Sequence, residues 1–373
     1  GVTGAYRPYV SEAQRSQGGC SASQTQLDFH HGLLGPRKTG LRAILSSGVQ
    51  PHMLQAQSPV RRRDLPVLRL LVAMAVGLVS LAVLGQTQSA LRAQGRERSM
   101  FVSVLDSSGA PVEGLATADF VIEEDGAERE VLRVGRATAP MQLAVLVDTS
   151  GSAAFATRDI RNGLETFISG VIEGNTIALV TFGGPPRILV ESTNQLDRLR
   201  DGIGRIFAYS DSAAYLLDAL VETARGFERR AAPRPVIVVV TSEGIDYSTH
   251  SSGRVLEALG ASQAATHVIV LKDQAISAAL RASRLEGSHL LETLDQRDLV
   301  LERGPTSTGG QRRDLLMSTA TRDALGRLAG ILTSQYEVVY ARPASLIPPE
   351  HIAVRMRRSD LTAQGTPVRR TGN

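Results

Sequence analysis

An aspartate and two serines follow a long apolar segment at alternate positions. Leu143–Val147 carries no charge, and Asp148, Ser150 and Ser152 come directly after it. An apolar run of this kind predicts a strand that is buried on both faces of a parallel sheet. A carboxylate and two hydroxyls at i, i+2 and i+4 can converge where the strand ends, and such oxygen atoms are the ligands that Mg²⁺ prefers. Open α/β sheets also bind their ligands at this edge.

A second apolar run ends in a similar way. Val236–Val240 is followed by a short polar segment that contains Glu243 and Asp246. Both runs have the character of buried parallel strands. We therefore expect Glu243 to meet Asp148 at one edge of the sheet.

The segment Asp148–Ser152 matches the DxSxS motif that begins the metal-ion-dependent adhesion site of von Willebrand factor A (VWFA) domains. The resemblance extends from about Ser99 to the C-terminus. Residues 102–106 and 115–126 resemble the small β-segment of a group of bacterial exported "VWFA-related" proteins, and residues 328–340 resemble the last helix and strand of that group. This resemblance implies a Rossmann-like α/β fold, with a doubly wound, mostly parallel sheet flanked by helices and a small N-terminal all-β unit.

The same resemblance implies a divalent-metal site for Mg²⁺ or Mn²⁺. By analogy with the family, Ser150 and Ser152 would bind the ion directly, and Asp148 and Glu243 would bind it directly or through water. Asp246 would orient these ligands. In the family, an acidic side chain of a protein partner fills the open coordination position. We therefore expect a non-enzymatic protein that binds a protein partner through this ion.

Two positions depart from the family pattern. A threonine is expected four residues before Asp218, but the chain has Ala214 there. Ser212 could replace it only if the loop shifts. The family usually has aspartate where this chain has Glu243. These departures predict weak metal binding, and they leave open a degenerate site on a scaffold whose protein interactions need no metal.

The net positive charge of the chain comes from its first 90 residues. The 373 residues are 42% hydrophobic and 21% charged, with a net charge of +4. Residues 1–90 contain 9 Lys and Arg but only 3 Asp and Glu, whereas the rest of the chain contains 32 basic and 34 acidic residues. The basic excess therefore predicts no nucleic-acid partner.

Residues 53–93 have the pattern of a secretory signal. Arginines precede the uncharged apolar segment Leu70–Gly85, and small residues offer cleavage near Ala90 or Ala93. If the apolar segment is extended to residues 65–85, an uncleaved membrane anchor is the alternative. We expect an exported protein that is periplasmic, secreted or anchored. Residues 1–52, which hold the single cysteine, Cys20, are expected to be disordered or absent from the natural product.

The remaining chain divides into three expected parts. Residues 99–136 contain short strands separated by Gly and Pro, which predicts a small β unit. Residues 140–341 alternate strands and helices, as expected of the VWFA domain. Within this region, residues 273–313 are expected to form a helix and a mobile loop. Residues 342–373 are expected to form a final strand and a tail.

Enzymatic functions fit the residues less well than a binding function does. A dehalogenase-type phosphatase needs an acid where the chain has Ser150. The nucleophile elbow G-x-S-x-G and the dinucleotide motif G-x-G-x-x-G are absent around the strand ends. His267 begins an apolar strand and is interpreted as a core residue. A metal-dependent hydrolase is the less favoured alternative, and no small-molecule substrate is expected.

Overall fold

The computed structural model describes residues 97–285, 290–342, 349 and 351–367. Residues 1–52, expected to be disordered or absent from the natural product, the expected signal segment at 53–93 and the possible anchor at 65–85 lie outside this part of the chain. Within the described part, no helix is both long and apolar enough to cross a lipid bilayer.

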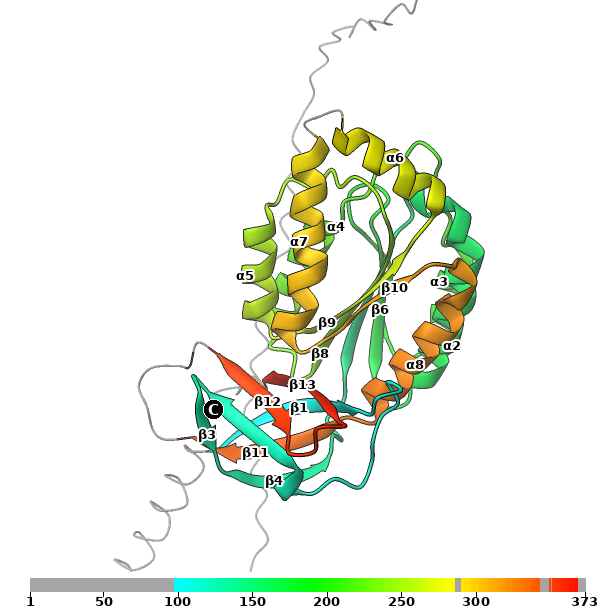
Figure 1. Ribbon diagram of the computed structural model, residues 1–373. Coiled ribbons are helices and arrows are strands. Elements are labelled where there is room, and N and C mark those ends of the chain that lie inside the picture. The colour runs from blue at the N-terminus through cyan, green and yellow to red at the C-terminus, as the bar shows by residue number, and fades with distance from the viewer. Residues whose placement is uncertain (1–96, 286–289, 343–348, 350, 368–373) are drawn as a thin grey trace, which may run out of the picture. The chain divides into compact units, whose positions relative to one another are not determined.

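The larger region is built on a mixed sheet whose strand order is β10-β9-β8-β5-β6-β7 (Figure 1). Its strands are β5 (Gln142–Val147), β6 (Thr176–Thr181), β7 (Arg187–Thr193), β8 (Pro235–Ser242), β9 (Ala265–Leu271) and β10 (Arg312–Leu315). All neighbours are parallel except β7, which runs antiparallel to β6 at one edge. This sheet confirms the predicted doubly wound, mostly parallel α/β fold.

Helices cover both faces of the sheet (Figure 1). The first face carries α2 (Thr157–Val171), α3 (Leu196–Gly204) and α8 (Thr321–Thr333). The second face carries α4 (Leu216–Arg229), α5 (Ser252–Ser262) and α7 (Leu290–Thr308). Alternate residues of β5 enter the two apolar cores, Val145 on the first face and Leu146 on the second. An uncharged strand in the middle of the sheet is the consequence of this burial on both sides.

Three further elements lie at the carboxyl ends of the parallel strands. The 3-10 helix η2 (Gly151–Ala156) follows β5 directly, and α6 (Gln274–Leu285) follows β9. A second 3-10 helix, η3 (Ser318–Ala320), follows β10. The edge that carries the DxSxS segment is therefore formed by connections between the strands and the helices that follow them.

The β unit consists of two antiparallel sheets around a third apolar core. Their orders are β13-β1-β11-β4 and β12-β2-β3. The strands are β1 (Glu97–Leu105), β2 (Phe120–Glu124), β3 (Ala127–Arg129), β4 (Val131–Arg136), β11 (Tyr336–Ala341), β12 (Ile352–Met356) and β13 (Thr362–Pro367), and the 3-10 helix η1 (Thr117–Asp119) precedes β2. The all-β unit expected from residues 99–136 therefore also includes strands from the C-terminal part of the chain.

Three strands differ from the sequence interpretation. We expected β11 within the 140–341 region, but it pairs with β1 and β4. Its burial alternates along the strand, as in an antiparallel sheet with one face toward solvent. Residues 362–367, expected in the tail, form β13 against β1. Residues 273–313, expected as a helix and a mobile loop, contain two helices, α6 and α7, and the start of β10, which pairs with β9.

Candidate metal centre

The Asp148 side chain fixes the first turn of the loop that follows β5. Its Oδ1 atom accepts hydrogen bonds from the backbone N–H of Ser150 at 2.9 Å and from the Ser150 hydroxyl at 2.6 Å. Both residues are buried. The DxSxS spacing therefore works here as a local turn that holds a carboxylate and a hydroxyl side by side.

Four side chains form a closed group of oxygen atoms at this position, which we call the oxygen cluster. Ser150 Oγ lies 2.9 Å from Ser152 Oγ. Ser242 Oγ, at the end of β8, lies 3.0 Å from Ser152 Oγ and 3.2 Å from Asp148 Oδ2. The parallel pairing of β5 with β8 brings these chain-distant residues to one edge. The sequence analysis placed the end of the strand that contains Ser242 at this edge, but it did not identify Ser242 as a site residue.

A buried arginine contacts the residues that hold the Asp148 carboxylate in place. Asp148 Oδ2 accepts hydrogen bonds from the Thr241 hydroxyl at 2.8 Å and from the Ser242 N–H at 3.1 Å. Arg297 on α7 donates to the same Thr241 hydroxyl at 2.7 Å and to the carbonyl oxygens of Ser242 and Gly244. Arg297 is only 2% exposed. A positive charge therefore lies one hydroxyl away from the Asp148 carboxylate.

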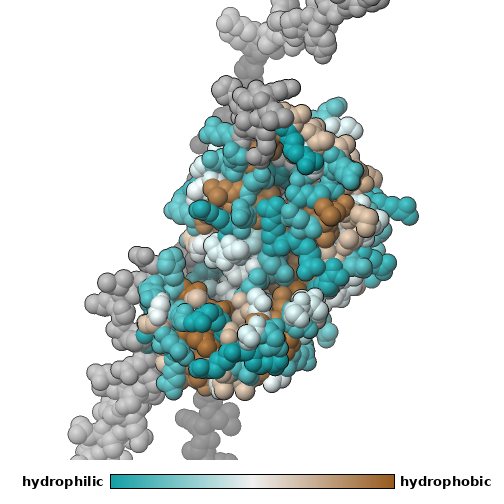
Figure 2. All heavy atoms as spheres, viewed as in Figure 1, coloured by the Kyte–Doolittle hydropathy of each residue, from teal (hydrophilic) through white to brown (hydrophobic). Residues whose placement is uncertain are grey.

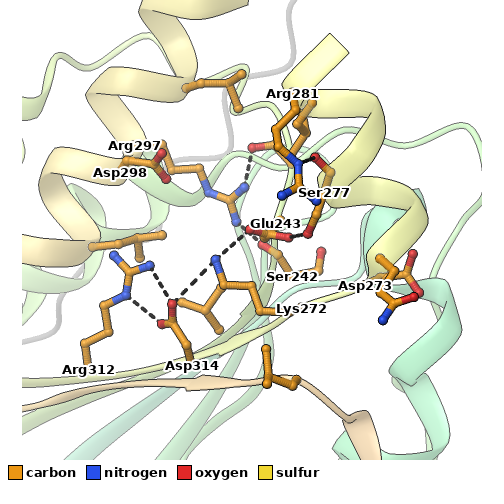
Figure 3. A pocket seen from close by; sticks show the side chains of 17 residues that line it. Ser242, Glu243, Lys272, Asp273, Ser277, Arg281, Arg297, Asp298, Arg312 and Asp314 are labelled. Carbon is orange, nitrogen blue, oxygen red and sulfur yellow. Dashed lines mark hydrogen bonds and ion pairs between the residues drawn. The ribbon is translucent and has the colours of Figure 1, made fainter. Parts of the chain in front are cut away.

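Glu243 has its contacts outside the oxygen cluster. Its carboxylate lies 2.6 Å from the ammonium of Lys272 and accepts a hydrogen bond from the Ser277 hydroxyl of α6 (Figure 3). These groups line a pocket of about 490 Å³ beside the cluster. The predicted ligand role of Glu243 is therefore not supported by these contacts, since Lys272 already balances its charge.

The same pocket contains a second charge pair. Asp314 lies 2.7 Å from Arg312 and 3.5 Å from Lys272 (Figure 3). Burial raises the pKa of Asp314, but hydrogen bonds and charge from Arg312 and Lys272 outweigh this effect and hold the pKa below its usual value. Lys272 and Arg312 therefore already have carboxylate partners in this pocket.

Asp246 and Ser212 hold loops rather than join the cluster. The buried Asp246 carboxylate accepts hydrogen bonds from the N–H groups of Leu216 at 2.8 Å and Ser248 at 3.0 Å, which fixes the start of α4. The Ser212 hydroxyl donates to the carbonyl oxygens of Tyr209 and Thr149, at 2.7 and 3.2 Å. Neither side chain has a recorded contact with the cluster oxygens.

Ala214 occupies the position where the family pattern expects a threonine. The residue is buried, and its side chain belongs to the apolar core of the second face. Its backbone forms bridges to Gly183 and Asp246. The segment around Ala214 is thus close to the site, but it contributes no oxygen from its side chain.

Two glycines allow the loops around the cluster to pack closely. A Cβ atom at Gly151 would lie 2.3 Å from the carbonyl oxygen of Ser210, and one at Gly183 would lie 2.2 Å from the carbonyl carbon of Thr149. Any larger residue would push these backbones apart. The glycine inside the DxSxS segment is therefore required by the neighbouring loop.

The oxygen cluster fits a small divalent cation in donor type and spacing. Two Mg²⁺ ligands at 2.0–2.1 Å and at right angles are about 3 Å apart, close to the separations of the serine oxygens. Only one member of the cluster, Asp148, is charged. Within the described residues, no group of three or more His, Cys, Asp or Glu side chains could hold a metal ion. The ligands available here are thus one carboxylate and the hydroxyls of Ser150, Ser152 and Ser242.

A histidine–aspartate pair near the start of α4 was not anticipated from the sequence. His250 Nδ1 lies 2.6 Å from Asp218 Oδ1, and the same oxygen accepts the N–H groups of Thr249 and His250. Asp218 was recognised only as part of the D-A-L pattern. The Asp218 carboxylate connects α4 to the loop after β8, so the histidine–aspartate pair has a structural role.

The family model of the von Willebrand factor type A domain matches residues 143–245. The match therefore includes β5 except for its first residue, all of β8 and all four members of the oxygen cluster. The search of curated proteins found no match.

Similar solved structures have low sequence identity. A von Willebrand factor type A protein from Catenulispora acidiphila is 11% identical, with a TM-score of 0.39, over 73% of this chain and 72% of that chain. The conserved hypothetical protein BatB from Bacteroides thetaiotaomicron is 12% identical, with a TM-score of 0.36, over 52% and 100%. The vWF domain of the type V pili tip protein Mfa5 from Porphyromonas gingivalis is 19% identical, with a TM-score of 0.27, over 30% and 40%. The family-model match carries the assignment: this chain contains a von Willebrand factor type A domain.

Proposed function

We propose that the chain is an exported, non-enzymatic protein that binds a protein partner at the carboxyl edge of its α/β sheet. A weakly bound Mg²⁺ or Mn²⁺ ion would be held by Asp148, Ser150 and Ser152, together with Ser242. When bound, the ion would supply a coordination position for an acidic side chain of the partner. The observation that carries this proposal is the spacing of the cluster oxygens, from 2.6 to 3.2 Å.

Weak binding follows from the charges around the cluster. Asp148 is its single carboxylate, and the guanidinium of Arg297 lies one hydroxyl away. Glu243 already has Lys272 as its ion-pair partner. A dication at the cluster would therefore gain attraction from one carboxylate and experience repulsion from a fixed cation.

The exposed apolar residues favour a protein partner at the same edge. Figure 2 shows a largely hydrophilic face with small, separate hydrophobic patches. Most of the exposed large hydrophobic side chains of the described residues lie in connections at the carboxyl ends of the parallel strands or in the loop before α4, and Ile188 lies near the start of β7. These exposed side chains are Phe155, Ile188, Phe207, Tyr209, Tyr247, Leu316 and Met317. Exposed apolar groups concentrated in this way favour a protein-binding surface.

The contacts around the candidate nucleophiles favour binding over catalysis. The hydroxyls of Ser150, Ser152 and Ser242 contact one another and Asp148. In the described part of the chain, no histidine has a recorded contact with any of them. General-base catalysis would need a base within hydrogen-bonding reach of the nucleophile.

Calorimetric titration of the full chain with Mg²⁺ and Mn²⁺ tests the metal part of the proposal. The natural protein should bind in the millimolar range, and Asp148→Asn should lose binding because it removes the only carboxylate of the cluster. Glu222→Gln, on the exposed side of α4, is the matched control and should bind like the natural protein. Metal binding that survives Asp148→Asn would refute the assigned site.

A pull-down from envelope extract, with and without EDTA, tests partner binding. Capture by the natural protein should fall when EDTA is added and in Asp148→Asn, but it should persist in Glu222→Gln. Equal capture by all three proteins would contradict the role of the ion.

A metal-independent interaction scaffold is the second candidate function. The ion pair between Glu243 and Lys272 favours it, because this pair needs no metal to balance its charge. If this alternative is correct, the partner should be captured equally with and without EDTA. The calorimetric titration should then show no heat of metal binding.

A further inference from the structure

A second cavity lies on the other side of the DxSxS loop from the Glu243 pocket. It has a volume of about 490 Å³, and Thr149 lines it together with residues of the turn after β6, of β7 and of the loop after α3. We call it the arginine groove and define it by Arg187, Ile188, Arg205, Phe207 and Tyr209. None of the residues that line the cavity is acidic.

In the part of the chain that the structure describes, the two arginines of the groove have no carboxylate partner. Arg187 and Arg205 are exposed. Arg205 donates a hydrogen bond to the carbonyl oxygen of Leu189 at 3.2 Å, which orients its guanidinium along β7. Within the described residues neither arginine forms an ion pair. This distinguishes the groove from the Glu243 pocket, where Lys272 and Arg312 contact carboxylates.

The apolar side chains of the groove are exposed, and contacts hold the Phe207 ring and the Tyr209 backbone in place. Ile188, Phe207 and Tyr209 are 60%, 53% and 65% exposed. The Arg161 guanidinium lies 4.2 Å from the centre of the Phe207 ring and donates to the carbonyl oxygen of Ile206. The backbone N–H of Tyr209 donates to the Thr149 carbonyl oxygen at 3.1 Å. Fixed apolar groups of this kind lose little conformational entropy when a partner binds.

We propose that the arginine groove binds an extended segment of the protein partner in which an acidic residue stands next to an aromatic or large aliphatic residue. The arginines would receive the carboxylate, since a planar guanidinium can form two parallel hydrogen bonds to it. Ile188, Phe207 and Tyr209 would receive the apolar side chain. Buried aromatic anchors and arginines typically supply most of the affinity of such contacts.

The position of the groove connects it to the oxygen cluster. Thr149 lines the groove and stands between Asp148 and Ser150 in the loop. The inference rests on the proposed function and deepens it, because it specifies which residues the protein partner presents at the same edge of the sheet. Its arginines, however, need no metal ion to hold a carboxylate.

Selection from a random peptide library on phage, with the full chain as target, tests the proposal. The selected peptides should be enriched in Asp or Glu next to Phe, Tyr, Trp, Leu or Ile. A fluorescent copy of one selected peptide is then titrated against the natural protein and its variants, with anisotropy as the readout. Arg187→Gln and Arg205→Gln should each weaken binding by about tenfold, as expected for the loss of a charged hydrogen bond.

Matched controls separate the groove from general charge effects. Arg229→Gln removes an exposed arginine at the end of α4 and should leave the peptide affinity unchanged. A peptide with its acidic residue changed to the amide should bind weakly to the natural protein and should lose nothing further in Arg187→Gln. Selected peptides without acidic residues, or groove variants that bind the peptide as tightly as the natural protein does, would overturn the proposal.

The same proteins separate this proposal from the metal site. Calorimetric titration with Mn²⁺ should be unchanged in Arg187→Gln and Arg205→Gln, and part of the peptide affinity should persist in EDTA. If the natural protein binds no metal but its peptide affinity still depends on the two arginines, the metal site fails and the groove stands. If metal binds but the arginine variants lose no peptide affinity, the groove fails.

Discussion

The ammonium of Lys272 lies 2.6 Å from the carboxylate of Glu243, and both side chains line the pocket that residues of α6 and α7 also line (Figure 3). Lys272 follows β9 and Glu243 follows β8, so the pair joins the ends of neighbouring parallel strands. Since Glu243 is the next residue after Ser242 of the oxygen cluster, this ion pair determines how much negative charge is available beside the cluster.

Lys272→Met should increase metal affinity. The substitution removes the cation that balances Glu243, so the free carboxylate would add negative charge next to the cluster. We expect Mn²⁺ to bind more tightly by on the order of tenfold, the lower end of the effects seen for groups that support metal ligands. Calorimetric titration measures the change, with Arg229→Gln as a control for loss of an exposed positive charge. Unchanged or weaker binding would mean that Glu243 has no influence on the site.

Arg297→Met should destabilise the domain. The buried guanidinium donates to Thr241, Ser242 and Gly244, and the substitution leaves these three oxygens without that donor. We expect a loss on the order of 3 kcal/mol in the free energy of unfolding, measured by urea denaturation. Arg254→Gln, which breaks an exposed pair with Glu257, should change it by less than about 1 kcal/mol. Equal effects of the two substitutions would show that Arg297 is not a structural anchor.

His267 should make the protein less stable in acid. The residue is fully buried in β9, both ring nitrogens lack hydrogen-bond partners in the described structure, and burial lowers its pKa to about 4 from a usual 6.5. Between these values the unfolded chain binds a proton that the folded chain does not. Stability from this source is therefore present above pH 6.5 and is lost as the pH falls toward 4, by on the order of 3 kcal/mol.

Substitution of His267 tests this pH dependence. His267→Leu should show a smaller loss of unfolding free energy between pH 6.5 and pH 4 than the natural protein. It should also be at least as stable at pH 7, because an unpaired buried N–H group is removed. His351→Gln, at an exposed histidine, should keep the natural slope. An unaltered slope in His267→Leu would assign the acid sensitivity to other groups.

Tyr340→Phe should weaken the β unit. The Tyr340 hydroxyl donates to the buried Glu124 carboxylate at 3.0 Å, and Glu124 also pairs with Arg129 at 3.2 Å and Arg342 at 3.5 Å. Burial, followed by the hydrogen bond and charge of Glu124, raises the pKa of Tyr340 well above its usual value. Loss of this donor should cost about 1–3 kcal/mol in urea denaturation. Tyr247→Phe, at an exposed tyrosine, should have almost no effect.

The sequence predicted those parts of the structure that depend on local pattern. The uncharged run at residues 143–147 requires burial on both faces, and it forms the β5 strand in the middle of the sheet. The alternation of Asp148, Ser150 and Ser152 was sufficient to place three of the four oxygen-cluster residues together. Such features are set within a few residues of chain.

The remaining features depend on pairing between distant segments. Ser242 joins the cluster only because β8 lies beside β5, and Arg297 reaches it from a helix that the sequence presented as irregular. Glu243 has the negative charge that a metal ligand needs, but the sequence spacing did not indicate that Lys272 would pair with it. Likewise, the strand pattern of residues 336–340 was evident, whereas its position against β1 was not. A periodic pattern shows which face of a strand is buried, but it does not identify the neighbouring strand.

The position of β1 has a consequence for the order in which the chain can fold. β1 lies between β11 and β13, which come from the C-terminal part of the described chain, whereas every strand of the α/β sheet lies within residues 142–315. During synthesis, which proceeds from the N-terminus, the α/β sheet can therefore pair completely while both edges of β1 still lack partners. Contacts of such large sequence separation form slowly. The β unit should close last, and a ribosome stalled after α8 would present β1 as an open edge to other chains.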